Sequence, residues 1–207
     1  MGTVEEPLNG SKGCGGVMRV APVGLIGNDP FQLGCETAAV THGHPTGYLA
    51  AGALALMINR LVHEEKLGDA VQAALAELRQ HKGHEETSNA LQHALRATGA
   101  GSASPERIEE LGQGWVAEEA LAIAVYAAIM AGKDFASGLR LAVNHSGDSD
   151  SAGAIAGNIL GTMLGVEAIP ERWLASLELR DEITALADDL LTGYRNDDAW
   201  RHRYPGW

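Results

Sequence analysis

Cysteine, aromatic residues and basic residues are scarce in this chain, and each shortage argues against particular folds or functions. The two cysteines, Cys14 and Cys35, form no C-x-x-C pair, which disfavours zinc and dithiol redox motifs and predicts a reduced, cytoplasmic protein. Aromatic residues make up 5% of the chain while Ala and Gly abound, a composition that favours close-packed helices over sheets. A formal net charge of −12 disfavours a nucleic-acid partner, although a local nest of N–H groups can still hold a small phosphorylated ligand.

Several functional motifs are also missing. Residues 1–9 lack the basic start and apolar run of a signal peptide. The stretch 143–165 is not expected to span a membrane, because Asp150 and Asn158 interrupt it and its apolar run is too short. No Gly-Lys-Ser/Thr follows the glycine-rich opening, which disfavours a P-loop triphosphatase, and no Gly-x-Ser-x-Gly elbow marks an α/β-hydrolase. The length fits one ordinary domain, so we expect a single domain over 1–207, with 1–9 and 196–207 as candidate flexible ends.

Helical periodicity dominates the chain and predicts an all-α fold of eight or nine helices. Asp29 is expected to cap a helix that Pro30 opens, and Ser104-Pro105 to start a short one. The expected helices are Phe31–Val40, Tyr48–Glu65, Leu67–Gln80, Glu85–Thr98, Ala117–Ala131, Phe135–Val143, one ending near Gly165 and one ending near Gly193.

Two carboxylates and a hydroxyl, those of Asp148, Asp150 and Ser151, fall within four residues at a predicted helix start. Such oxygen ligands suit a hard cation such as Mg²⁺, Ca²⁺ or Mn²⁺. We expect Ser149 or Asp150 to cap the helix. The alternative is that Asp148 only stabilises the turn before the helix, Asp150 is the helix N-cap and no metal binds.

Glycine patterns suggest two further features. Gly153, Gly157, Gly161 and Gly165 share one helix face, which predicts close approach of another backbone or of a ligand. Residues 9–16 hold four glycines and could present N–H groups to phosphate oxygens; the alternative is a floppy tail.

The apolar run that follows this loop contains Arg19, which we expect to be buried and paired with an acid or a ligand oxyanion, with an internal salt bridge favoured.

The histidines offer fewer candidates. His42 and His44 flank Gly43 before a proline turn, where they could bind a ligand or serve as capping or surface residues. His145 could hydrogen-bond the acidic loop or cap the preceding helix. His81 and His84 are expected to be solvated.

Three stretches, in this order, resemble the ADP-ribosylglycohydrolase family, which includes dinitrogenase reductase-activating glycohydrolases and J1-type crystallins. They are residues 10–22, residues 41–45 and residues 144–151, with a softer match over residues 114–121. The resemblance implies an all-α fold and removal of ADP-ribose, by hydrolysis of an N- or O-glycosidic bond, from a modified protein or a small ADP-ribosyl adduct. It also implies two Mg²⁺ or Mn²⁺ ions as cofactors.

By this resemblance Asp148, Asp150 and Ser151 are metal ligands, with Asp150 bridging the two ions. The ADP-ribose phosphates would lie on the glycine-rich loop beside His42. That loop comprises Ser11, Lys12, Gly13, Cys14, Gly15 and Gly16. Lys12 stands where some relatives carry an aromatic residue that stacks on adenine, so it could instead meet a phosphate. Cys14 stands where Asn is common, and Ser151 where Thr is more frequent.

The largest departure is that the family's Gly-Asp segment and Thr-Asp-Asp run, which supply other metal ligands and the catalytic acid, have no match here. The catalytic residue is therefore unassigned, and three hypotheses stay open. The chain is a family hydrolase that is truncated here or completed by another polypeptide, a degenerate protein that binds ADP-ribose or a partner without catalysis, or a structural crystallin-like protein. The candidate partners include a second copy of the chain and a complementing N-terminal segment. The first predicts an exposed apolar groove beside Gly153, Gly157 and Gly161.

Overall fold

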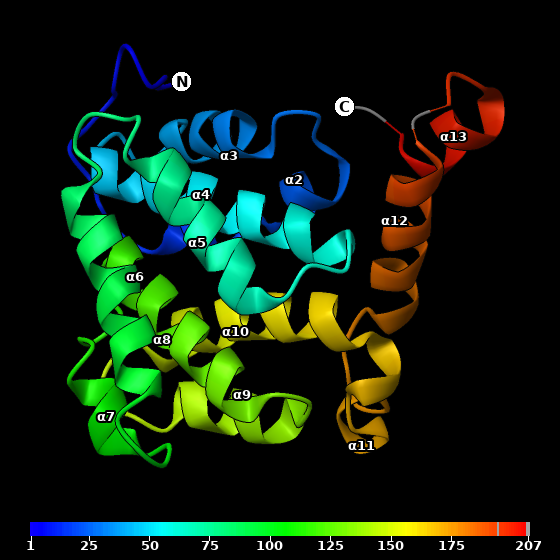
Figure 1. Cartoon of the computed structure of the whole chain (residues 1–207). Helices are drawn as coiled ribbons and strands as arrows, with labels where there is room; N and C mark the ends of the chain where they lie inside the picture. The colour runs from blue at the N-terminus through cyan, green and yellow to red at the C-terminus, as the bar shows by residue number, and fades with distance from the viewer. Residues whose placement is uncertain (194, 206–207) are drawn as a thin grey trace. The chain divides into compact units, whose positions relative to one another are not determined.

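The computed structural model describes residues 1–193 and 195–205, and these residues are all-α, as predicted. They form thirteen α-helices, one 3₁₀ helix and no strand. The chain divides into two compact units, Met1–Ile169 and Pro170–Trp207, which are described separately (Figure 1). The single-domain expectation stays a prediction.

The first unit contains ten α-helices and the 3₁₀ helix. Their bounds are α1 Gly15–Met18, α2 Ala21–Ile26, α3 Pro30–Ala39, α4 Pro45–Val62, α5 Leu67–Leu78, α6 Glu85–Thr98, α7 Pro105–Glu109, α8 Ala117–Ala131, α9 Phe135–Val143, α10 Ser149–Leu164 and the 3₁₀ helix Val166–Ala168.

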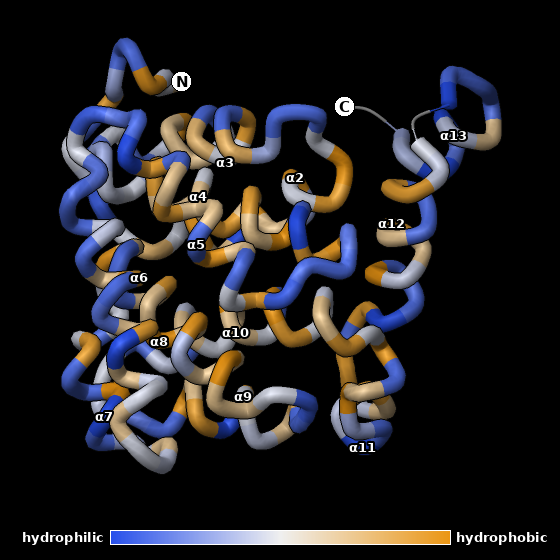
Figure 2. The backbone as a smooth tube through the Cα atoms, viewed as in Figure 1, coloured by the Kyte–Doolittle hydropathy of each residue, from blue (hydrophilic) through white to orange (hydrophobic). Residues whose placement is uncertain are grey.

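Helices α4 and α8 form the core of the first unit because both are apolar on nearly every side. Helix α4 packs against α2, α3 and α5, and α8 packs against α6, α9 and α10. Figure 2 shows hydrophilic residues concentrated in the connecting loops of this unit, with hydrophobic residues recurring along its helices. The two central helices thus present their N-terminal ends, at Pro45 and Ala117, as fixed points for the loops that precede them.

Helices α3 and α4 approach closely through glycine. A Cβ placed on Gly52 would collide with the Cys35 sulfur and the Phe31 carbonyl oxygen, and one on Gly34 would lie 2.9 Å from the Ala55 methyl group. Neither glycine is at a positive φ, so the requirement is for space between the helices and not for an unusual backbone.

We therefore expect Gly52→Ala to lower the free energy of unfolding by about 1–3 kcal/mol, since the added methyl group overpacks the α3–α4 contact. Urea denaturation followed by circular dichroism measures this. Gly68→Ala is the matched control, because a Cβ there meets nothing within 4 Å. Equal stability of the two variants would contradict the close approach.

The helix boundaries differ from the predictions mainly at turns and short elements. Helix α4 begins at Pro45, three residues earlier than expected, because His44 Nδ1 accepts a hydrogen bond from Thr46 N at 3.2 Å. It ends at Val62, and Glu64 then adopts a φ of 64°. Asp29 caps α3 as predicted. Helices α1 and α2 lie where no helix was predicted, so the described residues hold more helices than the eight or nine predicted.

The second unit contains α11 (Glu171–Leu174), α12 (Arg180–Thr192) and α13 (Asp198–Arg203). Helix α12 ends next to Gly193, as predicted. Asp189 on α12 accepts hydrogen bonds from Arg203 Nη1 at 2.6 Å and from the Tyr204 hydroxyl at 2.7 Å. These contacts fix part of the predicted flexible end; its last two residues, 206 and 207, lie outside the described residues.

Across the described part of the chain, no helix combines the length and apolarity that crossing a membrane would require.

Candidate functional site

The glycine-rich loop is held by the N-terminal ends of the two central helices. Ser11 O accepts a hydrogen bond from His44 N at 3.1 Å, and Lys12 O accepts one from Ala117 N at 2.9 Å. Gly13 also pairs with Val116 in an isolated antiparallel bridge. The loop is therefore an ordered part of the fold, and the floppy-tail alternative is wrong for residues 11–13.

His42 lies directly beneath this loop. A Cβ on Gly15 would sit 3.3 Å from His42 Cε1, and one on Gly13 would sit 3.5 Å from Nε2. The Nδ1 atom is 2.7 Å from the Thr41 hydroxyl. Burial, together with the nearby Arg19 charge, lowers the pKa of His42, so a neutral imidazole backs the loop at neutral pH.

Arg19 is exposed, and the expectation of a buried, acid-paired arginine was wrong. Its guanidinium donates to the Thr41 hydroxyl at 2.6 Å and to the carbonyl oxygens of Thr37 at 3.2 Å and Gly15 at 3.4 Å. The physical reason is that Arg19 follows α1 as its C-cap, which turns its side chain back along the outside of α1 and α3.

The acidic turn is organised by Asp148, which caps α10 in place of the expected Ser149 or Asp150. Its carboxylate accepts from Ser151 N at 3.3 Å and from Ser151 Oγ at 2.9 Å. Asp148 is 6% exposed and Ser151 2% exposed, whereas Asp150 lies at the surface. Asp148 is the N-cap because its ψ of 82° is not helical, which lets its carboxylate accept hydrogen bonds from the first turn of α10.

A close backbone contact fixes this turn against the loop before α8. Asp148 N donates to Gln113 O at 2.7 Å, and a Cβ on Gly147 would collide with the Gln113 carbonyl group. Glu119 holds the other side of that loop by accepting from Gln113 N at 2.9 Å and from Gly114 N at 3.1 Å. The turn is thus set by α8 as well as by α10.

Cys14 joins the glycine-rich loop to the acidic turn. Its Sγ donates to Asp148 Oδ2 at 3.1 Å and lies 3.1 Å from Ser151 Oγ. The Ser151 hydroxyl is also 3.2 Å from the sulfur of Met18 on α1. Two regions more than 130 residues apart therefore form one cluster.

The protonation states of this cluster follow from burial and hydrogen bonding. Burial pushes the pKa of the Asp148 carboxyl upward, but hydrogen bonds from Cys14 and Ser151 outweigh it, and the net pKa is lowered. Burial raises the pKa of the Cys14 thiol. At neutral pH the cluster thus holds an ionised carboxylate beside a protonated thiol, which is a weak nucleophile.

The Lys12 side chain, unlike that of Cys14, does not contact the acidic turn; its ammonium group forms ion pairs with two carboxylates. The Nζ atom lies 2.9 Å from Glu86 Oε2 on α6 and 3.3 Å from Glu118 Oε1 on α8. The Thr46 hydroxyl also donates to Glu86, at 2.6 Å. The hydrogen bond to Glu86 is the largest of the effects that raise the pKa of Lys12. Contact with a phosphate stays a prediction, but the ammonium already has partners that sequence reasoning missed.

The other candidate histidines have local partners. His145 Nδ1 accepts from Gly147 N at 3.1 Å, which confirms a hydrogen bond to the acidic loop. His44 is a helix cap, as one alternative held. His81 stacks on Phe31 at 4.7 Å and His84 Nδ1 is 2.9 Å from Ser88 Oγ, so these two are half-buried and not simply solvated.

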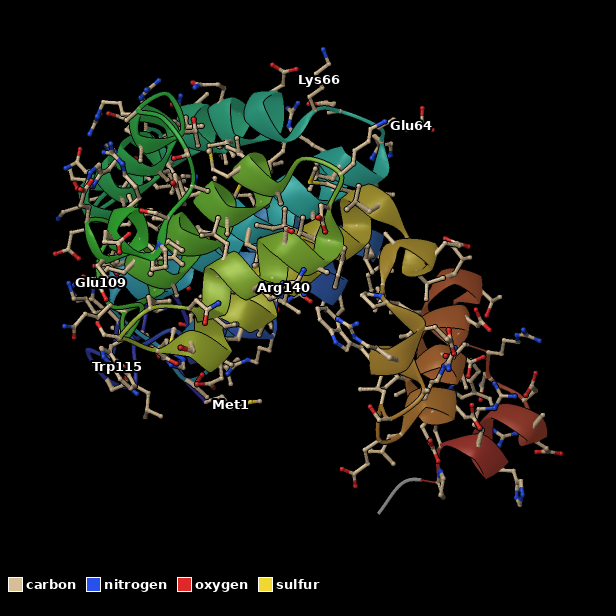
Figure 3. All side chains as sticks on the ribbon, turned by 90° about the horizontal axis from the view of Figure 1, so that it is seen from below. Met1, Glu64, Lys66, Glu109, Trp115 and Arg140 are labelled. Carbon is tan, nitrogen blue, oxygen red and sulfur yellow. The ribbon has the colours of Figure 1, made fainter. Side chains whose placement is uncertain are left out.

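Trp115 is the feature of the site to which sequence reasoning gave no role. Its side chain is 60% exposed and projects from the surface next to Val116, the bridge partner of Gly13 (Figure 3). Large aromatic side chains are usually more buried than this. The one sequence signal was its place in the softer motif at residues 114–121, which says nothing of exposure.

The glycine face of α10 is close-packed only at its start. A Cβ on Gly153 would meet Val143 Cγ1 of α9 at 2.7 Å, whereas one on Gly161 would meet nothing within 4 Å. Gly165 ends the helix at a φ of 77°. The groove predicted beside these glycines stays a prediction. A hollow of about 730 Å³ lies at the C-terminal end of α10, lined by Leu25, Leu61, Val62, Glu64, Glu65, Lys66, Leu67, Thr162 and Met163.

The donor set at the acidic turn fits a divalent cation only in part. Asp148 and Ser151 bring two oxygens together, with Asp150 at the surface beside them, and such oxygens suit Mg²⁺ or Mn²⁺. Among the residues that the structure describes, no three His, Cys, Asp or Glu side chains gather as a metal cluster. These residues therefore supply some, and not all, of the ligands that a divalent cation needs.

The chain is similar to known proteins over most of its length. Residues 2–199 match the family model described as ADP-ribosylglycohydrolase. An uncharacterized protein of Archaeoglobus fulgidus is 35% identical, over 86% of this chain and 57% of its own length. The ADP-ribosyl-[dinitrogen reductase] glycohydrolase of Rhodospirillum rubrum is 28% identical, over 87% and 56%. Human ADP-ribosylhydrolase ARH3 is 27% identical, over 87% and 58%.

A solved structure entitled "ADP-ribosylglycohydrolase-related protein complex" matches with a TM-score of 0.69 and 31% identity, covering 89% of this chain and 62% of that one. The chain spans a little more than half the length of the curated relatives it matches.

Proposed function

Because the chain belongs to the ADP-ribosylglycohydrolase family, we propose that its site binds ADP-ribose and contributes to hydrolysis of an ADP-ribosyl bond. The observation that carries this proposal is the contact of Cys14 with both Asp148 and Ser151 at 3.1 Å. It brings a loop suited to phosphates next to oxygens suited to cations. The substrate is a modified protein or a small ADP-ribosyl adduct.

In this proposal, different residues of the site bind different parts of ADP-ribose. The main chain of Ser11–Gly16 meets the diphosphate, with the neutral His42 behind it. Asp148, Asp150 and Ser151 would hold Mg²⁺ or Mn²⁺, and a bound cation would supply the positive charge to orient ribose hydroxyls and to activate a water. The curated relatives extend beyond the matched region, and we propose that their additional segment, in the same polypeptide or as a separate chain, supplies the remaining ligands and the catalytic acid.

Two free cysteines favour a reduced compartment such as the cytoplasm.

The proposal is tested by isothermal titration calorimetry of ADP-ribose in Mg²⁺, in Mn²⁺ and in chelator. Binding that strengthens with either cation supports it, and absence of binding under all three conditions overturns it. A parallel assay for release of ADP-ribose from modified protein separates the alternatives. Binding without release would favour a binding role for this chain.

Trp115 offers a stacking surface for the adenine ring, because its indole is exposed beside the loop. We expect Trp115→Ala to weaken ADP-ribose binding by about 1–3 kcal/mol, the typical cost of removing an aromatic side chain on which a base stacks. Ribose 5-phosphate, which lacks adenine, is the control ligand and should bind both forms equally. The same loss for both ligands would argue against stacking.

A further inference from the structure

The Asn9 side chain links the two segments that line the proposed phosphate site. Its Oδ1 atom accepts hydrogen bonds from Ser11 N at 2.9 Å, at the start of the glycine-rich loop, and from Gly43 N at 3.2 Å, in the turn that carries His42. Its Nδ2 group donates to Thr41 O at 3.0 Å, in the same turn. Both ends of one amide group therefore join the loop to a turn more than 30 residues further along the chain.

The main chain around Asn9 packs against the same turn. A Cβ on Gly43 would collide with the Asn9 carbonyl oxygen, so glycine leaves the space that this carbonyl group occupies. Gly2 N donates to Val40 O at 3.4 Å, just before the turn. The N-terminal segment thus holds the turn that carries His42 through its main chain as well as through the Asn9 side chain.

The placement of His42 beneath the loop depends on how the turn meets the loop. A Cβ on Gly15 would lie 3.3 Å from His42 Cε1, so the imidazole and the loop are in close contact. The main chain contributes a hydrogen bond from His44 N to Ser11 O at 3.1 Å. Asn9 reinforces this main-chain link with hydrogen bonds to both segments.

We propose that Asn9 is a positioning residue for ADP-ribose binding, which holds the glycine-rich loop and the His42 turn in the arrangement that the diphosphate meets. It acts through these two segments and does not contact the ligand. The physical reason is preorganisation, because N–H groups already fixed in one arrangement lose less conformational freedom when a phosphate binds to them. This inference rests on the proposed function, which assigns the diphosphate to the main chain of Ser11–Gly16.

Two substitutions separate this link from the local turn at the start of the loop. Asn9→Ala removes every hydrogen bond of the side chain. Asn9→Ser keeps a hydroxyl that can accept from Ser11 N, two residues further on, but the shorter side chain loses the contacts with Thr41 and Gly43. Because the link to the turn is what positions the loop, we expect both variants to weaken ADP-ribose binding about tenfold, as the loss of one or two hydrogen bonds would.

Asn59→Ala is the matched control. Asn59 Nδ2 donates to Gly24 O at 3.0 Å and joins α4 to α2 near the C-terminal end of α4, whereas the glycine-rich loop meets the N-terminal end of that helix. This variant also loses a hydrogen bond from a side-chain amide to a carbonyl oxygen. It should therefore lose stability, measured by urea denaturation, without losing affinity for ADP-ribose.

The test is calorimetry of ADP-ribose with Mn²⁺ present, together with amide hydrogen exchange of each ligand-free chain. The His44 amide is the reporter, because it donates to Ser11 O and not to Asn9. It should exchange about tenfold faster in Asn9→Ala and in Asn9→Ser, and with little change in Asn59→Ala. A role confined to overall stability would move the urea midpoint and leave the ADP-ribose affinity unchanged.

Wild-type affinity in either Asn9 variant would overturn the inference. Weaker binding with unchanged His44 exchange would also overturn it, since the loss would then not arise from the link between the loop and the turn. A wild-type chain that binds no ADP-ribose would remove the proposed function, and the His44 exchange would still decide whether Asn9 holds the loop to the turn. Equal binding by the wild-type chain and Asn9→Ala would remove only the role of Asn9.

Discussion

Asp148→Asn is expected to abolish the cation-dependent part of ADP-ribose binding. The substitution removes the buried negative charge while keeping a side chain that can still cap α10. Because the carboxylate is the most buried charged group at the acidic turn, we expect affinity in Mn²⁺ to fall about 100-fold, toward the value in chelator. Calorimetry in both conditions measures the effect.

Asp134→Asn is the matched control for this prediction. Asp134 caps α9 through a hydrogen bond from Ser137 N at 2.9 Å, as Asp148 caps α10, and it lies outside the candidate site. Its variant should bind ADP-ribose like the wild-type chain. Retention of full Mn²⁺ dependence in Asp148→Asn would show that the cation binds elsewhere.

Lys12→Met is expected to destabilise the fold by about 1–3 kcal/mol, because it leaves the Glu118 carboxylate buried without its counter-ion. The methionine keeps most of the apolar stem of lysine, so the effect isolates the ammonium group. Burial raises the pKa of Glu118, whereas the charge and the hydrogen bond of Lys12 lower it, so removal of the ammonium group disfavours the charged form of Glu118. Urea denaturation gives the change in the free energy of unfolding.

Two companion variants make this second prediction specific. Glu118→Gln in the Lys12→Met background should recover most of the lost stability, since the buried charge is then gone. Lys133→Met, at an exposed position before α9, should be nearly neutral. A Lys12→Met chain as stable as Lys133→Met, but with weakened ADP-ribose binding, would instead place Lys12 on a phosphate.

The longer helices could be predicted because their signals are local. Helices α6, α8 and α9 begin and end at the predicted residues, and Asp134 caps the last of them. Helices α1 and α2 were missed because segments of four and six residues are too short to show a helical period. Their packing comes from tertiary contacts with α4 that no local pattern reveals.

The site was predictable as two motifs but not as a cluster. Asp148 and Ser151 are visible in the sequence because they crowd one helix start, and Cys14 because it interrupts a run of glycines. Their contact depends on how α1, α8 and α10 pack, and the Lys12–Glu86 pair likewise joins residues 74 positions apart. Arg19 was misplaced because an apolar run was taken to be buried on all sides, whereas the turn after α1 exposes it.

The most direct test of the account is the effect of paramagnetic Mn²⁺ on the amide resonances of the isotope-labelled chain. If the acidic turn and the glycine-rich loop form one site, sub-stoichiometric Mn²⁺ should broaden the amide signals of Gly13, Cys14 and Gly15. It should leave the Gly68 amide on α5 sharp, and Asp148→Asn should remove the broadening. Mn²⁺ that leaves the loop signals unchanged, or broadens them equally in Asp148→Asn, would contradict the central claim.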